Sequence, residues 1–378
     1  MRDIVILGST GSIGVQALEV IAANPELFRV VGLSAGGNNL TLLAKQVRDF
    51  NVPIVGVNSG AQELKSSLSG VKVIDGSGAS EQIASLTCDL VLNAITGSIG
   101  LAPTLAALAS GNKVALANKE SLVAGGDLVM AYGSEKIIPV DSEHSALFQA
   151  MSAGRVSDVS KLILTASGGP FRDRQDLSQV KLADALAHPT WSMGPVVTIN
   201  SATLVNKGLE IIEAHYLFSI AYSKIEAVIH PQSIVHSLVE FKDGSTLAQA
   251  SPPDMKGPIA YALAYPNRVG GAMAPINWNS KQSWEFEPID EKRFPAVQLA
   301  RRAGALGSSV AAIYNAANEV AVAAFMKEEI AFTAIVDTIE KVVDKLSASA
   351  PSRIRDISDV SAIEQDARIY AREVLKKG

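Results

Sequence analysis

Residues 3–14 read DIVILGSTGSIG, and this stretch decides how the first part of the chain folds. Asp3–Leu7 is a β-branched run typical of a buried strand, and Ser12–Asn24 is amphipathic with helical spacing. Residues 8–14 join the two with a GxxGxxG spacing. Glycine permits a tight turn and a close backbone approach, and a helix that begins there presents free N–H groups to a phosphate. The stretch therefore predicts a strand, a phosphate-binding turn and a helix.

The glycine spacing favours a dinucleotide site, although it differs from the commoner GxGxxG. An ordinary glycine-rich turn is the alternative. The next strand, Phe28–Leu33, leads into Ala35-Gly36-Gly37-Asn38, which contains no acidic residue. Enzymes that use NAD place a carboxylate at this point to bind the ribose 2′-hydroxyl. Its absence favours NADP over NAD.

The same alternation of strand and helix patterns continues to residue 141. Further strands are expected at 53–57, 71–74, 89–95, 113–117 and 137–140, and helices at 40–50, 81–86 and 101–109. Strands that alternate with helices predict an α/β fold with a doubly wound parallel sheet. We therefore expect a Rossmann-like domain over residues 1–141.

The pattern changes after residue 141. Short strand-like runs at 162–165, 227–229, 234–241 and 246–249 predict a central α+β domain over residues 142–264. Proline, asparagine and tryptophan mark residues 265–289 as a connector. Residues 290–378 are predicted to form a helical bundle, in which Ser361 and Glu364 form a capping box at the start of the last helix.

Composition narrows the function classes. The 378 residues contain 33 Lys and Arg against 38 Asp and Glu, with a formal net charge of −5, which excludes a nucleic-acid binder with a basic surface. An anionic ligand must therefore be bound by local groups. The single cysteine, Cys88, excludes an internal disulfide framework and a multi-thiolate zinc site, fits a reducing compartment and is expected in the core.

The N-terminus shows no signal or transit pattern, and the most apolar window, Leu90–Leu108, contains Asn93, Gly97 and Pro103. This window is typical of a strand, a loop and a helix rather than of a membrane span. We expect a soluble cytoplasmic protein that binds neither membranes nor nucleic acid.

Polar residues at predicted strand ends are candidates for chemistry. Asn118-Lys119-Glu120 follows the strand at 113–117, at the edge where doubly wound sheets bind ligands, although a solvated helix start explains it as well. Asp141 and Glu143 lie two residues apart, so in an extended chain they point the same way and suit a hard divalent cation. A polar strand end is the alternative.

The segment Ser201–Glu210, SATLVNKGLE, is predicted to be one helix with Asn206, Lys207 and Glu210 on one face. These side chains either form an exposed ion pair or bind a phosphate and supply a third metal ligand. The segment 167–194 is long and flanked by glycines, which is typical of an active-site lid or of a mobile surface loop. His215, His230 and His236 are expected to be structural.

Eight motifs in the same order resemble one family, 1-deoxy-D-xylulose 5-phosphate reductoisomerase of the non-mevalonate isoprenoid pathway. They span nearly the whole chain: GSTGSIG at 8–14, ANKES at 117–121, PVDSEH at 139–144, SGGPF at 167–171, HPTWSMG at 188–194, NSATLVNKGLE at 200–210, HPQSIVHS at 230–237 and NAANEVAVAAF at 315–325.

The resemblance implies a homodimer that uses NADPH and one Mg²⁺, Mn²⁺ or Co²⁺ ion per site. It implies metal ligands at Asp141, Glu143 and Glu210. The implied substrate contacts are Lys119, Ser142, Glu143, Ser167, His188, Ser201, Asn206, Lys207 and Glu210, of which Ser167, Ser201, Asn206 and Lys207 hold the phosphate. The implied cofactor contacts are Thr10, Gly11, Ser12, Ile13, Gly36, Gly37, Asn38, Asn118, Glu120 and Gly194. Trp191 and Met193 belong to the lid, and Lys119 and Glu143 are the candidate catalytic acid–base groups.

The implied reaction is rearrangement of 1-deoxy-D-xylulose 5-phosphate, followed by hydride transfer to give 2-C-methyl-D-erythritol 4-phosphate. A metal-independent NADP dehydrogenase of the semialdehyde type and a non-catalytic nucleotide-sensing protein are the alternatives. One position departs from the family pattern, because many members carry Lys where this chain has Gly37. We expect retained NADPH preference with weaker discrimination against NADH.

Overall fold

The computed structural model describes residues 1–191 and 193–377. Ser192, which falls inside the predicted lid, lies outside the described residues. The chain forms two compact units. One contains Met1–Ser121, Val129–Ser145 and Asp254–Ala274, and the other contains Leu122–Leu128, Ala146–Pro253 and Pro275–Gly378.

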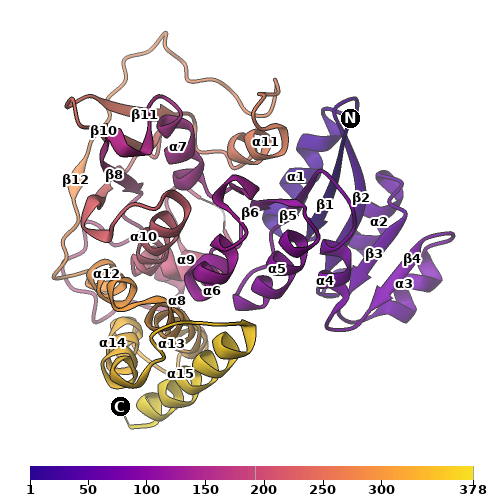
Figure 1. The fold of residues 1–378 in the computed structure, drawn as a ribbon. Coiled ribbons are helices and arrows are strands. Elements are labelled where there is room, and N and C mark those ends of the chain that lie inside the picture. Colours follow the sequence, from indigo (N-terminus) through magenta and orange to yellow (C-terminus); the bar gives the residue numbers. More distant parts are fainter. Residues whose placement is uncertain (192, 378) are drawn as a thin grey trace. The chain divides into compact units, whose positions relative to one another are not determined.

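The first unit is built on a seven-stranded sheet in the order β4-β3-β2-β1-β5-β6-β7. Figure 1 labels β1 to β6 of this sheet. Every pair of neighbouring strands is parallel. The strands are β1 (Arg2–Leu7), β2 (Phe28–Ala35), β3 (Ile54–Val57), β4 (Lys72–Asp75), β5 (Leu90–Asn93), β6 (Lys113–Leu116) and β7 (Ile137–Pro139). The strand order reverses between β1 and β5, and such a switch point is where doubly wound sheets bind ligands. The predicted Rossmann-like sheet is confirmed.

Helices connect these strands, as the alternating pattern predicts. They are α1 (Ser12–Ala22), α2 (Leu40–Asp49), α3 (Ala61–Ser67), α4 (Ala79–Ala84) and α5 (Leu101–Ala109). A later helix, α11 (Lys256–Ala264), packs against α1. Two helices, α6 (Glu120–Met130) and α7 (Ser142–Met151), contain residues of both units. The apolar window at Leu90–Leu108 forms β5, a short 3₁₀ turn and α5, as expected.

The second unit contains a five-stranded sheet in the order β11-β10-β8-β9-β12. Its strands are β8 (Val159–Ala166), β9 (Ile225–Ile229), β10 (Val235–Phe241), β11 (Thr246–Ala250) and β12 (Glu287–Pro288). Only β8 and β9 are parallel among the described strand pairs of this sheet. Three helices follow β8 before the chain returns to β9: α8 (Leu182–Leu186), α9 (Pro195–Ala202) and α10 (Val205–Phe218). The sheet and its helices give the predicted α+β architecture.

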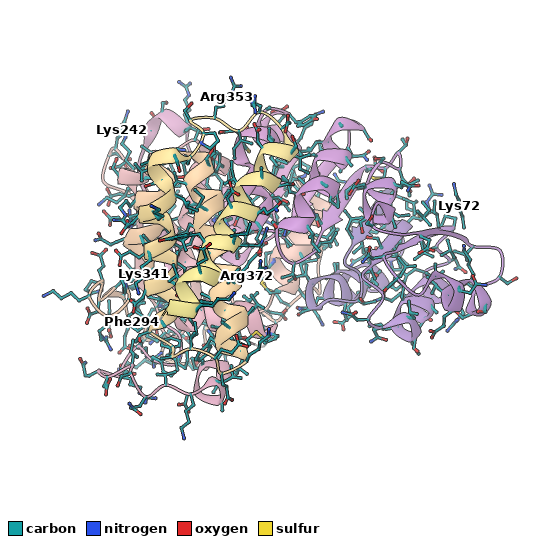
Figure 2. All side chains as sticks on the ribbon, turned by 90° about the horizontal axis from the view of Figure 1, so that it is seen from below. Lys72, Lys242, Phe294, Lys341, Arg353 and Arg372 are labelled. Atoms are coloured by element: carbon teal, nitrogen blue, oxygen red, sulfur yellow. The ribbon has the colours of Figure 1, made fainter. Side chains whose placement is uncertain are left out.

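The last part of the chain is helical, as predicted. It comprises α12 (Ala296–Leu306), α13 (Ser308–Met326), α14 (Ala334–Leu346) and α15 (Ile357–Lys377). Helix α13 is long and apolar enough to cross a membrane, but most of it is buried inside the unit, which is typical of a core helix. Polar residues such as Lys341 of α14 and Arg372 of α15 are exposed (Figure 2).

Three local predictions are wrong. Residues 141–143 are not extended, because α7 begins at Ser142 and Asp141 caps it by accepting from the backbone N–H of Glu143 at 3.1 Å. The segment 201–210 is not one helix, because Leu204, with φ of +58°, separates α9 from α10. Ser361 does not begin the last helix, since its hydroxyl donates to Ile357 O within α15. Asp356 accepts backbone N–H groups at the helix start instead.

Gly208 of α10 determines how closely this helix approaches its neighbours. A Cβ at this position would lie 2.7 Å from Ala300 Cβ and 3.0 Å from the hydroxyl of Tyr314. We predict that Gly208→Ala lowers the free energy of unfolding by about 1–3 kcal/mol, because overpacking outweighs the gain in helix propensity. Urea denaturation measures this change.

Ala300→Gly provides the matched control, because it removes the atom that the new methyl group would meet. A double-mutant cycle should show that the two substitutions are coupled, so that the double variant loses less stability than the sum of the single variants. Additive effects would show that the contact between α10 and α12 is not the cause.

Candidate active site

The glycine turn after β1 is held in place by the neighbouring strand and helix. The backbone N–H groups of Gly8 and Ser9 donate to Ser34 O at 2.9 and 3.0 Å. The Ser9 hydroxyl donates to the side chain of Gln46 at 2.8 Å, and the Gln46 amide donates back to Ser9 O at 2.8 Å. Sequence reasoning missed Gln46. A polar glutamine on the apolar face of the predicted helix at 40–50 is the sequence feature that could have indicated it.

The predicted cofactor contacts of the first unit lie at the carboxyl edge of its sheet. Thr10, Gly11, Ser12 and Ile13 form the turn and the start of α1, and Gly36, Gly37 and Asn38 follow the adjacent strand β2. The first turn of α1 contains no acidic residue, so its free N–H groups favour an anion such as a pyrophosphate.

The backbone conformation and the space around Gly37 explain why this position holds glycine rather than lysine. Its φ is +109°, and a Cβ there would lie 2.4 Å from Ser59 O. A side chain at this position therefore requires the loop to move. Glycine at this position leaves no side-chain cation beside the predicted cofactor contacts. The Asn39 side chain caps α2 by accepting from the Leu42 N–H at 3.0 Å.

Asn118 joins the loops that follow β5 and β6. Its side chain is 1% exposed and donates to Ile95 O at 2.8 Å and to Gly97 O at 2.9 Å, while its oxygen accepts from the Ser121 backbone at 3.0 Å. The amide also donates to Glu120, the other predicted cofactor contact of this segment. The side-chain amide of Asn118 thus shapes the loop, which leaves its backbone as the part available to a cofactor.

Asp141 and Lys119 meet at the end of the sheet formed by β6 and β7. Lys119 forms an ion pair with Asp141, and His144 Nδ1 lies 3.2 Å from the other carboxylate oxygen of Asp141. Burial alone would raise the pKa of Asp141, but the charges of Lys119 and His144 and their hydrogen bonds hold it well below the ordinary value. Asp141 is therefore an anion at neutral pH. Glu143 lies in the first turn of α7 and accepts from the Ser142 hydroxyl.

The second unit brings Asn206, Lys207 and Glu210 together at the start of α10. Both Asn206 and Lys207 donate to the Glu210 carboxylate. Lys207 and Glu210 are 3% and 1% exposed, so this is a buried ion pair rather than an exposed one. Leu204 adopts a left-handed conformation that is rare outside glycine, and such residues are frequent at functional sites.

Three further predicted substrate contacts meet in the same unit. His188 Nε2 lies 3.1 Å from the Ser167 hydroxyl and 3.1 Å from the Ser201 hydroxyl. The two left-handed glycines of the SGGPF turn make this possible, since a Cβ at Gly169 would lie 3.0 Å from Ser201 O. Two hydroxyls and one imidazole from three separate segments form a cluster of neutral donors.

The predicted lid carries Trp191, Met193 and Gly194. The Trp191 ring lies 6.3 Å from the ring of His236, and Gly194 is the N-cap of α9. The other three histidines contact backbone oxygens. His215 Nδ1 lies 2.8 Å from Ile220 O, His230 Nδ1 lies 2.8 Å from Glu285 O, and His236 Nε2 lies 3.1 Å from Ser251 O. These contacts are those of structural histidines. Cys88, expected in the core, is half-buried.

Three acidic side chains could hold a metal ion. Asp141, Glu143 and Glu210 each offer one carboxylate oxygen, and these oxygens lie within 4.8 Å of one another. A set made only of carboxylate oxygens suits a hard divalent cation such as Mg²⁺ or Mn²⁺.

Comparison with known proteins gives a consistent result over the whole chain. Three family models match: 1-deoxy-D-xylulose 5-phosphate reductoisomerase at residues 4–126, the C-terminal domain of the same enzyme at 137–218, and the DXP reductoisomerase C-terminal domain at 250–370. The chain is 53% identical to the 1-deoxy-D-xylulose 5-phosphate reductoisomerase of Kitasatospora griseola, over 98% of the chain and 99% of the relative. It is 56% identical to that of Mycobacterium marinum, over 99% and 93%.

Solved structures agree with the sequence relatives. A DOX-P reductoisomerase in complex with NADPH, fosmidomycin and magnesium is 35% identical, with a TM-score of 0.93, over 100% of this chain and 98% of that one. The reductoisomerase of Zymomonas mobilis in complex with NADPH is 39% identical, with a TM-score of 0.92, over 99% of each chain.

Gly14 is the glycine of the turn with the least room. A Cβ there would lie 2.4 Å from Gly8 O, whereas one at Gly11 would lie 3.3 Å from the same atom. We predict that Gly14→Ala weakens dinucleotide binding at least about tenfold, because the turn and α1 must separate. Isothermal titration calorimetry with NADPH measures this.

Gly11→Ala is the matched control and should weaken binding less, since its methyl group needs only a small adjustment. Equal affinities for Gly14→Ala and the unchanged protein would contradict the role given to the close backbone approach.

Proposed function

The chain belongs to the 1-deoxy-D-xylulose 5-phosphate reductoisomerase family, and we propose that it binds NADPH and one divalent cation and converts 1-deoxy-D-xylulose 5-phosphate to 2-C-methyl-D-erythritol 4-phosphate. The approach of three carboxylate oxygens within 4.8 Å of one another is the observation that carries this proposal. Neither alternative function requires it, because a metal-independent dehydrogenase and a nucleotide sensor need no such group.

Asp141, Glu143 and Glu210 are proposed as the metal ligands. Carboxylates crowded so closely repel one another unless positive charge lies between or beside them. Lys119 beside Asp141 and Lys207 beside Glu210 supply part of that charge. A bound divalent cation would supply the rest, and would stabilise the negative charge that develops on the substrate oxygens when a carbon–carbon bond next to a ketone breaks.

The phosphate of the substrate is assigned to Ser167, Ser201, Asn206 and Lys207. Their hydroxyl, amide and ammonium groups are hydrogen-bond donors, and Asn206 and Lys207 lie in the first turn of α10, where the helix dipole favours an anion. This local donor set explains how an acidic protein binds an anionic sugar. Ser142 and His188 complete the proposed substrate contacts.

Lys119 is proposed as the acid–base group nearest the reacting carbons, together with Glu143. Lys119 is 14% exposed on its side chain and held by Asp141, so its ammonium group has a fixed direction from which to give or receive a proton. Trp191 and Met193 would close over the substrate and exclude water, which keeps the fragments of the rearrangement in place.

The cofactor is assigned to the carboxyl edge of the parallel sheet. Residues 10–13 would bind the pyrophosphate, residues 36–38 the adenosine ribose, and Asn118, Glu120 and Gly194 the nicotinamide side. We propose residues 1–141 as the NADPH domain, 142–264 as the catalytic domain, 265–289 as the connector and 290–378 as the helical domain. Residues 254–274 differ from this division, because they pack with the first compact unit. We place the enzyme in the cytoplasm.

Glu210→Gln tests the metal assignment. The amide keeps the size of the side chain but removes its charge, so turnover should fall at least about a thousandfold while NADPH affinity changes less than about twofold. The oxidation of NADPH, followed by its absorbance with the phosphosugar and Mn²⁺, measures turnover, and a chelator should abolish it in the unchanged enzyme.

Glu213→Gln is the matched control, since Glu213 is a second buried carboxylate of the same helix. This variant should keep metal-dependent turnover. If Glu210→Gln turned over normally at saturating metal, Glu210 would not be a ligand. If turnover in the unchanged enzyme resisted the chelator, the dehydrogenase alternative would be favoured.

A homodimer is proposed because the segment after residue 275 leaves large apolar side chains exposed. Trp278 is 68% exposed, and Phe286, which directly precedes β12 at the edge of the sheet, is 45% exposed. A second copy of the chain would cover them. Sedimentation equilibrium should give twice the chain mass of 39.6 kDa, and Trp278→Ser should weaken the association. A monomer at micromolar concentration would contradict the proposal.

A further inference from the structure

His188 accepts two hydrogen bonds from the backbone that immediately follows it. The N–H groups of Thr190 and Trp191 donate to its Nδ1 at 3.1 and 2.9 Å. An imidazole nitrogen that accepts a hydrogen bond has a free lone pair and therefore carries no proton. The ring must then carry its proton on Nε2, and it must be neutral, because an imidazolium would have a proton on both nitrogens.

The position of that proton determines what the neighbouring serines can do. Nε2 lies 3.1 Å from both Ser167 Oγ and Ser201 Oγ. Because a protonated Nε2 can only donate, neither serine can give its hydroxyl proton to the ring. Ser167 Oγ also accepts from the Gly169 backbone N–H at 3.2 Å. The single Nε2–H is shared between the two serine oxygens, which both face it as acceptors. Their own protons are left to point elsewhere.

We propose that the backbone turn at Thr190–Trp191 is a positioning element, which fixes His188 in its Nε2–H tautomer and thereby directs the hydroxyl protons of Ser167 and Ser201 toward the substrate phosphate. The proposal rests on the proposed function, because it takes the two serines as phosphate contacts. In the opposite tautomer Nε2 would accept a hydrogen bond from one serine hydroxyl, which would remove that donor from the anion. The turn therefore selects a ligand group that only accepts, such as a fully ionised phosphate ester.

Two features of the ring environment agree with this arrangement. Burial lowers the pKa of His188, which keeps the ring neutral over a wider range of pH. The turn also lies within the predicted lid, so a lid that moved away would release Nδ1 and free the tautomer. The position of the lid and the direction of the Ser167 and Ser201 hydroxyl protons are therefore coupled through the His188 ring.

The tautomer can be measured directly. Proton–nitrogen correlation spectra of the protein with ¹⁵N-labelled histidine, free of substrate at pH 7.5, should show Nε2 protonated and Nδ1 unprotonated for the signal that disappears in His188→Gln. A signal from the Nδ1–H tautomer or from the imidazolium would overturn the proposal. This measurement requires no turnover, so it can succeed even if the proposed reaction fails.

Thr190→Pro tests the consequence for binding, because proline has no backbone N–H to donate. Thr190→Ala is the matched control, since it keeps the N–H and removes only the side chain. The Trp191 N–H still donates to Nδ1 in Thr190→Pro, so we expect a minor second tautomer beside the Nε2–H form in the spectra. KM for the phosphosugar should rise about threefold while kcat changes less, as for partial loss of one neutral hydrogen bond. Thr190→Ala should match the unchanged enzyme in both.

Each result of this pair has a defined meaning. Equal KM values and equal spectra for the proline and alanine variants would overturn the proposal. If Thr190→Pro did not fold, His188→Asn and His188→Gln would be compared instead. The shorter Asn amide can still accept from the turn but cannot reach the serines, whereas Gln keeps a donor near the position of Nε2. The KM of His188→Asn should therefore rise more than that of His188→Gln. The reverse order would overturn the proposal. Loss of NADPH oxidation in the unchanged protein would count only against the proposed function.

Discussion

The site depends on a negative charge that is kept inside the protein. Glu210 is 1% exposed, and a carboxylate buried this deeply costs several kcal/mol unless it is paired. Lys207 and Asn206 donate to it from the preceding turn of α10, and removing either partner of such a buried pair costs about 3–5 kcal/mol. The helix is in turn held where Gly208 lets it approach α12. Packing, charge pairing and the proposed metal site therefore rest on a single turn of helix.

The two units supply different kinds of chemistry to the proposed reaction. The parallel sheet offers backbone N–H groups at the turn after β1 and an ionised carboxylate, Asp141, at the end of β7. The second unit offers neutral donors around His188 and the charged pair of α10. Neither requires a basic surface. This explains how a chain with a net charge of −5 can bind a dinucleotide and a phosphosugar, because each anionic group meets donors that the fold places locally.

Much of the fold could be predicted from the sequence because its signals are local. GSTGSIG between a strand and a helix, and the alternation that follows, predict the doubly wound sheet that the structure contains. The failures share a physical cause, since each depends on contacts that periodicity does not encode. Nothing in SATLVNKGLE signals that Leu204 adopts a left-handed conformation. Asp141 follows a predicted strand, and the local sequence pattern does not show that it caps α7. Gln46 was missed because its partner, the Ser9 backbone, is distant in the sequence. Site residues could be named from a resemblance, but their pairing could not.

The proposed function requires that Asp141, Glu143 and Glu210 bind one cation together. Anomalous diffraction from crystals grown with Mn²⁺ and NADPH tests it most directly, because the metal is located without assumptions about the reaction. We expect one strong manganese peak per chain, in contact with an oxygen of each of the three side chains, and no such peak in Glu210→Gln. A manganese peak elsewhere, or one that does not contact Glu210, would contradict it.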